Sequence, residues 1–191
     1  GGDLSVAVGG ELELACDLGG QDMFVGGAAL HGSGTATLAG TVDVSTGGQY
    51  LLQDSGRVVP GPLLLFDPPT ALSTAGTHVD GQFLHQGGTH ASDQLYIGGP
   101  AGATYEMGLG TLSSGELHVG MSFSDGDAPG TLRLLDPAAR IEVSVALVVH
   151  PQGTLDAAPG AVIHMTGSAF ENHCTDPAAE DNPIVYVNDG F

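Results

Sequence analysis

The amino-acid sequence predicts an all-β protein, a parallel β-solenoid (β-helix) with coils of about 22 residues. Three observations favour this class. Apolar and polar residues alternate in short segments, a sequence pattern recurs at an offset of 22 residues, and glycine-rich turns separate the segments. No segment has convincing helical periodicity. Because short strands joined by glycine turns also build β-sandwiches, a sandwich is the alternative.

The alternating segments predict half-buried strands. Residues 3–18 place Leu4, Val6 and Val8 on one side and small or acidic residues on the other. Segment 140–150 alternates in the same way and is rich in β-branched residues, which favours a strand over a helix. We expect its apolar side chains to share one inward face: Ile141, Val143, Val145, Leu147 and Val149.

The repeat is clearest between the stretches "FLHQGGTHASDQLYIGG" and "YEMGLGTLSSGELHVGM". At the 22-residue offset Phe83 aligns with Tyr105 and His85 with Met107, and a weaker copy places Tyr50 in the Phe83 position. Equivalent residues of stacked coils form inward rows, so we expect His85 in the core. The recurring glycine before threonine is then a corner of the coil rather than a functional site.

These stretches resemble the glycine-rich repeats of secreted bacterial proteins, namely autotransporter-associated β-strand repeats and PEP-CTERM-type exported proteins. The clear match covers about a quarter of the chain, from Gly76 to Gly120. The resemblance implies a secreted, extracellular or cell-surface β-solenoid with a structural or adhesive role. It implies no catalytic residue, because such repeats share none.

The charge balance limits the kinds of partner that we expect the protein to bind. The chain has 22 acidic residues against three basic ones, all arginine, and a formal net charge of −19. Such a chain repels nucleic-acid phosphates and anionic membrane surfaces, so we expect neither as a partner. No apolar run approaches the roughly 20 residues of a membrane helix, so we expect no membrane insertion.

The sequence contains no nucleophile, metalloprotease or phosphate-loop motif, so we expect no enzymatic activity, no catalytic residue and no organic cofactor. The histidines lack the spacing of a transition-metal site, and we expect His90 and His118 to face solvent.

Two acidic loops are candidate calcium sites, each with a solvated turn as the alternative. The first, "SFSDGDAPG", is an insertion relative to the repeat, and the second is "CTDPAAEDNP". Their candidate ligands are Asp125, Asp127, Asp176, Glu180 and Asp181.

The two cysteines, Cys16 and Cys174, have no metal-binding spacing. In an oxidising compartment they would form one disulfide that closes a long loop, worth about 4–5 kcal/mol. Two buried thiols are the alternative.

We expect a single domain, 1–191, whose terminal strands 1–18 and 183–191 serve subunit contacts. Neither end shows a polar helix to cover the open strand edges of a solenoid. The predicted function is a secreted structural protein that assembles with itself, by head-to-tail strand complementation, into an extracellular filament, sheath or matrix. A monomeric surface adhesin or carbohydrate-binding solenoid, with extracellular polysaccharide as partner, is the alternative. The candidate assembly residues are Leu4, Val6, Val8, Ile184, Tyr186 and Val187.

Overall fold

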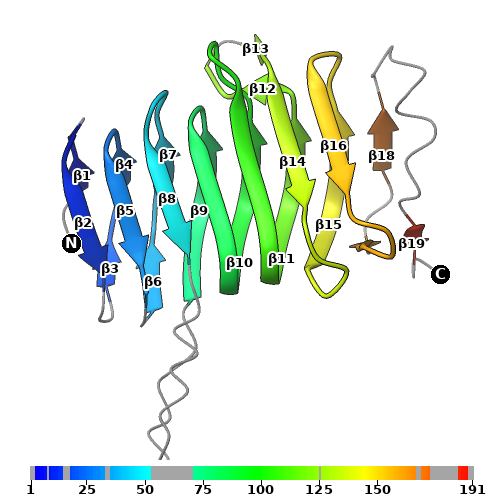
Figure 1. Ribbon diagram of the computed structural model, residues 1–191, viewed down its shortest axis with the longest axis horizontal. Helices are drawn as coiled ribbons and strands as arrows, with labels where there is room; N and C mark the ends of the chain where they lie inside the picture. The colour runs from blue at the N-terminus through cyan, green and yellow to red at the C-terminus, as the bar shows by residue number, and fades with distance from the viewer. Residues whose placement is uncertain are drawn as a thin grey trace, which may run out of the picture.

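The computed structural model describes residues 3–7, 9–14, 18–32, 35–52, 71–124, 126–166, 169–172 and 185–188. Their strands stack along one axis, from β1 at one end to β18 and β19 at the other (Figure 1). Each turn of the chain returns a strand to the same side of the molecule, one coil further along. The chain is therefore an all-β, parallel β-solenoid, as predicted.

The strands form three faces, which we call A, B and C in the order in which the chain visits them. Face A holds β1 (Leu4–Val6), β4 (Met23–Val25), β7 (Thr41–Val44), the C-terminal parts of β9 (Ala71–Val79), β10 (Gln82–Ile97), β11 (Ala103–Val119) and β15 (Arg140–Val149), and β18 (Ala169–Asn172). Face B holds β2 (Glu11–Leu14), β5 (Ala28–His31), β8 (Gln49–Leu52), the N-terminal parts of β10 and β11, β14 (Gly130–Leu134) and β16 (Gly153–Ala157). Face C holds β3 (Leu18–Gly20), β6 (Thr35–Leu38), the first part of β9, the middle of β10 and β11, the first part of β15, β17 (Val162–Met165) and β19 (Val185–Asn188).

Every pairing within the three faces is parallel, which rules out the β-sandwich alternative for the described strands. The exception lies outside the faces, where β12 (Met121–Ser122) pairs antiparallel with β13 (Gly126–Asp127). This hairpin is the insertion that the sequence placed around Asp127.

The register confirms the repeat. Phe83 pairs with Tyr105, and Tyr50 with Phe83, as the sequence alignment predicted. The 22-residue coil holds only for that part of the chain. Leu4 pairs with Met23, so the first coil has about 19 residues.

The core is a set of inward rows that run along the axis. The rings of Tyr50, Phe83 and Tyr105 are fully buried and stack with centroids 4.8 and 4.6 Å apart. Aliphatic rows of leucine, isoleucine and valine flank them. Because each row continues through successive coils, one coil alone cannot bury its inward face.

The chain turns between faces at glycines. Gly88 and Gly110 have φ values of +75° and +100°, where β10 and β11 pass from face B to face C. L-residues rarely adopt this conformation. The recurring glycine before threonine is thus a corner, as predicted.

Two predictions for individual side chains are wrong. Val145 is 51% exposed, because β15 turns the corner from face C to face A there and the alternation is interrupted. His90 is fully buried instead of facing solvent, because it occupies the inward row between Leu72 and Leu112.

Within the described residues, no helix is long and apolar enough to cross a membrane.

Candidate functional site

The strands of the first described coil each have one described neighbour, on all three faces. Among the described strands, β1 pairs only with β4, β2 only with β5 and β3 only with β6. Figure 1 shows these three strands at the end of the stack. At the edge of a parallel sheet, about half of the backbone N–H and C=O groups of the outer strand point away from the sheet and can bond to an added strand.

The hydrogen bonds identify which groups face outward from the edge. In β1, Leu4 donates its N–H to Asp22 and Val6 accepts from Gly26. Residues of a parallel strand bond to alternate sides, so Ser5 directs its N–H and C=O to the free side.

The same alternation holds in β2. Gly10, just before this strand, accepts from the Ala28 N–H. The N–H and C=O groups of Glu11 and Glu13 therefore face the free side.

The apolar core is also open at this end. Leu4, Leu12 and Leu18, one from each face, pack against the core but are only partly buried. Their neighbours in the next coil, such as Met23 and Ala36, are fully buried. A further coil stacked on this end would bury the three leucines.

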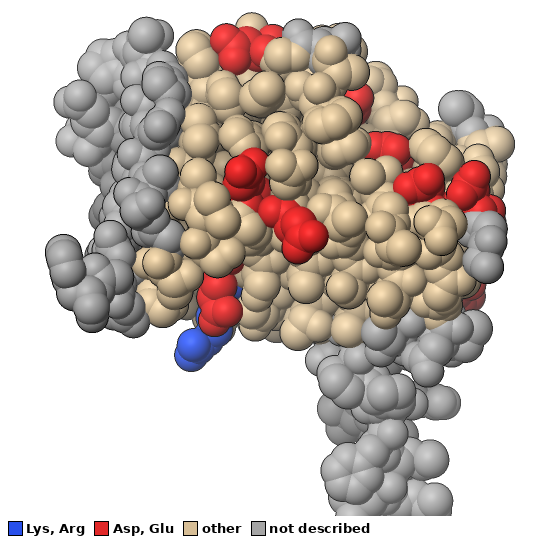
Figure 2. Space-filling view, turned by 180° about the vertical axis from the view of Figure 1, so that it is seen from behind, with Lys and Arg blue, Asp and Glu red and all other residues tan. Residues whose placement is uncertain are grey.

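The edge is acidic: Asp3, Glu11 and Glu13 are exposed. Acidic side chains are also spread over the surface seen in Figure 2, whereas basic ones appear only at its margin. Repulsion between carboxylates therefore opposes the approach of another acidic chain, and salt or divalent cations weaken this repulsion.

At the opposite end the last described strands are again paired on one side. Among the described strands, β16 pairs only with β14, β18 only with β15 and β19 only with β17. The predicted assembly residues Tyr186 and Val187 lie in β19, and Leu4 and Val6 lie in β1. Val8 and Ile184 lie outside the described residues.

Most of the predicted disulfide and calcium residues lie outside the described residues, namely Cys16, Cys174, Asp125, Asp176, Glu180 and Asp181. Asp127 ends β13, where its Oδ1 lies 3.3 Å from His150 Nδ1. Among the described residues no three His, Cys, Asp or Glu side chains are grouped so that they could hold a metal ion.

A polar network crosses the core at the stacked rings. The hydroxyl of Tyr105 lies 3.0 Å from His85 Nδ1 and 2.9 Å from His90 Nδ1. His85 Nε2 faces the Gly88 carbonyl at 3.4 Å, so Nε2 carries the proton and Nδ1 accepts from Tyr105. His90 then donates through Nδ1 to Tyr105 and accepts through Nε2 from Thr77, 3.0 Å away.

Burial keeps this network uncharged at neutral pH. It lowers the pKa of His85 to about 4, against an opposing effect of hydrogen bonds to the backbone of Gly88 and Gly87. Burial, and then repulsion from His85, lowers the pKa of His90 to about 3. Burial also raises the pKa of Tyr105 well above its ordinary value. These histidines are structural, because they are enclosed and uncharged.

The outer side of face A carries a second, partly exposed row. Its members Asp43, His78, Tyr96 and His118 pair in register. Asp43 Oδ1 accepts from His78 Nδ1 at 2.5 Å, and the rings of Tyr96 and His118 stack 4.7 Å apart. His118 thus faces outward as predicted, but its neighbours cover most of the side chain.

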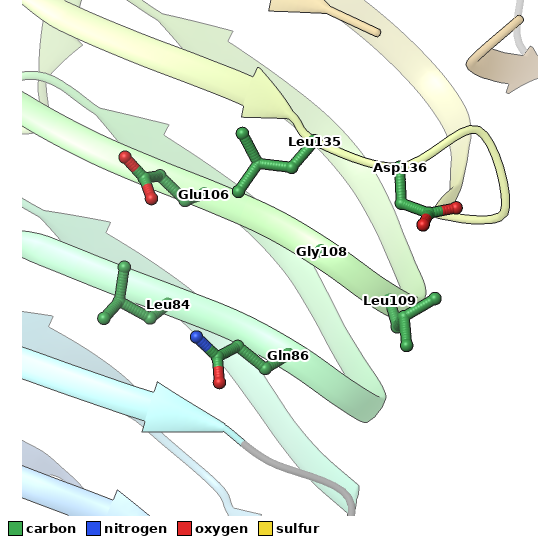
Figure 3. A pocket seen from close by; sticks show the side chains of 7 residues that line it. All are labelled: Leu84, Gln86, Glu106, Gly108, Leu109, Leu135 and Asp136. Carbon is green, nitrogen blue, oxygen red and sulfur yellow. The ribbon is translucent and has the colours of Figure 1, made fainter.

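A groove of about 360 Å³ lies on the outer side of face B. Figure 3 shows the residues that line it. Leu109 and Leu135 at its rim are 49% and 54% exposed. Its carboxylates already have structural partners, because Glu106 accepts from Arg133 at 2.8 Å and Asp136 accepts from the Ala138 N–H at 2.7 Å. This groove therefore provides apolar surface and no evident acid–base chemistry.

Comparison of the chain with protein-family models, curated proteins and solved structures gives no match.

Proposed function

We propose that this protein is a self-assembling structural subunit of an extracellular filament, sheath or matrix. The observation that carries the proposal is the first described coil, where three strands have a described neighbour on one side only and three core leucines are partly buried. A strand added at such an edge buries apolar area and forms backbone hydrogen bonds, and both stabilise the contact between subunits.

The geometry favours head-to-tail contacts. Faces A, B and C have the same order and strand direction at both ends. The first coil of one copy would therefore continue the sheets that end in β18, β16 and β19 of another. Such a contact is heterologous and leaves a free edge at each end of the pair, so it propagates into a filament instead of closing.

The test introduces proline at positions whose backbone N–H groups point to the free side of the edge strands. Ser5→Pro with Glu13→Pro removes two outward N–H groups without removing a ladder bond to β4 or β5. Two lost hydrogen bonds of about 1 kcal/mol each weaken association roughly thirtyfold. The matched control, Ser5→Ala with Glu13→Ala, keeps both donors.

Association is measured by sedimentation velocity over a concentration series, with negative-stain electron microscopy, in low salt, high salt and calcium. We expect filaments of the parent chain and of the alanine control, and shorter or absent filaments of the proline variant. A parent chain that stays monomeric in every condition contradicts the proposal, as does equal assembly of the two variants.

A further inference from the structure

We propose that a groove beside Phe123, on the outer side of face A, binds an uncharged polysaccharide or oligosaccharide chain. The groove has a volume of about 560 Å³ and is formed by β7, β9, the start of the face-A part of β10, and residues 122–124. It crosses several neighbouring strands, so it lies along the solenoid axis and suits an extended ligand. This inference does not rest on filament assembly, because the groove is on a side of the solenoid and not at its end.

Phe123 provides an aromatic surface at the rim. Its side chain is 58% exposed although it is large and apolar. One side of its ring stacks on His78, with centroids 4.3 Å apart and planes 9° apart. The Tyr96 ring makes a T-shaped contact with Phe123, with centroids 5.4 Å apart and planes at 68°. The ring is therefore held in place from below while its other side faces solvent. The apolar C–H face of a sugar ring packs well on such a surface.

Polar groups beside the ring can recognise hydroxyl groups. Asp43 receives hydrogen bonds from His78 Nδ1 at 2.5 Å and from Thr41 Oγ1 at 3.3 Å. A carboxylate accepts about four hydrogen bonds, so the oriented Asp43 has capacity left for ligand hydroxyls. The Gln94 amide, which donates to Glu116 at 3.1 Å, holds both donor and acceptor groups at the groove wall.

A glycine forms part of the groove wall, at a position where a side chain would be crowded. Gly76 lies between Thr41 and Gln94 in the neighbouring outward row of face A. Its φ is not in the positive region, so the backbone does not require glycine there. A Cβ at this position would lie 3.3 Å from Thr41 Cγ2 and 3.6 Å from His78 Nε2. A larger side chain at this position would therefore crowd Thr41 and His78, which both line the groove.

The charge of the groove selects against acidic sugars. Asp43 and Asp80 line it, and neither of the described arginines, Arg133 and Arg140, does. Polyuronates and sulfated glycans would meet repulsion, with no cation among the described lining residues to offset it. Uncharged glycans combine apolar ring faces with hydroxyl groups, which matches Phe123 beside carboxylate, amide and hydroxyl groups.

Affinity electrophoresis in gels that contain a soluble glycan tests the inference. The neutral probes are mixed-linkage β-glucan, glucomannan and arabinoxylan, and polygalacturonate is the anionic probe. We expect retardation by at least one neutral probe and none by polygalacturonate. Phe123→Ala and Gly76→Leu should each weaken binding at least tenfold.

Phe24→Ala is the matched control. Phe24 is 44% exposed and lies in the same outward row as Asp43 and His78, but it does not line the groove. Thermal unfolding of all variants checks that they fold. The inference is wrong if no neutral probe retards the parent chain, if Phe24→Ala and Phe123→Ala weaken binding equally, or if polygalacturonate binds best. These outcomes leave the filament assay unchanged, so the two proposals fail separately.

Discussion

At the scale of single residues, the buried hydroxyl of Tyr105 has two imidazole partners whereas that of Tyr50 contacts His31 at 3.0 Å. Tyr105→Phe removes the partner of both His85 and His90. A buried polar group left without a partner costs about 1–3 kcal/mol. We expect Tyr105→Phe to lower the free energy of unfolding by about 2–4 kcal/mol, and Tyr50→Phe by about half as much. Urea denaturation measures both, and an equal or smaller loss for Tyr105→Phe contradicts the assigned network.

The same histidines make the fold sensitive to acid. Their folded-state pKa values, about 4 for His85 and about 3 for His90, lie below the ordinary value of 6.5. The unfolded chain therefore binds protons first as the pH falls. Stability that is present above pH 6.5 is lost as the pH falls towards 4, at about 1.4 kcal/mol per pH unit for each histidine.

His85→Met removes one of the two titrating side chains, so its contribution to the pH dependence can be measured separately. Methionine suits the site, because Leu52 and Met107 occupy the same row in the neighbouring coils. In the variant, the other tautomer of His90 carries its proton on Nε2, donates it to Thr77 and accepts through Nδ1 from Tyr105. We expect the slope of unfolding free energy against pH, between pH 4 and 6, to decrease by about 1.4 kcal/mol per unit relative to the parent chain. An unchanged slope would show that His85 titrates normally in the folded state.

At the scale of elements, the corner glycines differ in what surrounds them. Gly102 and Gly110 both have positive φ, +87° and +100°, but only Gly110 is enclosed. A Cβ on Gly110 would lie 2.5 Å from the Gly88 oxygen and 2.7 Å from His85 Nε2, whereas one on Gly102 meets nothing within 4 Å.

We therefore expect Gly102→Ala to cost about 1–2 kcal/mol, from the backbone conformation alone. Gly110→Ala should cost a further 1–3 kcal/mol or so, because the added atom overpacks the corner. Thermal and urea unfolding of the two variants give the difference. Similar losses at the two sites would mean that the corner adjusts to the extra atom.

The elements also show what the sequence could predict. The partnership of Phe83 with Tyr105 was visible because stacked coils demand similar residues in one inward row. The same offset aligns His90 with Leu112, but an imidazole in an aliphatic row was not expected. Its polar partners Tyr105 and Thr77 come from other faces of the solenoid, so no local pattern revealed them. The exposure of Val145 was missed because alternation alone does not show where a strand turns a corner. The groove at Phe123 depends on a hairpin that interrupts the repeat, so no periodic signal marked it.

At the scale of the whole molecule, the net charge of −19 opposes self-assembly, whereas the strand edges of the first coil favour it. In a head-to-tail contact β2 would lie beside β16 of the next copy. Glu11 and Glu13 would then approach its exposed Asp156. Salt, divalent cations and lower pH should all promote assembly, because each weakens the repulsion between these carboxylates.

Local charge at the edge should matter more than net charge. Glu11→Gln with Glu13→Gln changes the net charge by two at the edge, and Asp93→Asn with Glu142→Gln makes the same change on exposed side positions. At about 10 mM salt, where screening extends over about 30 Å, we expect the edge variant to assemble at a lower protein concentration than the side variant. The difference should shrink near 1 M salt, where the screening length is about 3 Å. Light scattering against concentration measures both, and equal thresholds at low salt would place the subunit contact somewhere other than the first coil.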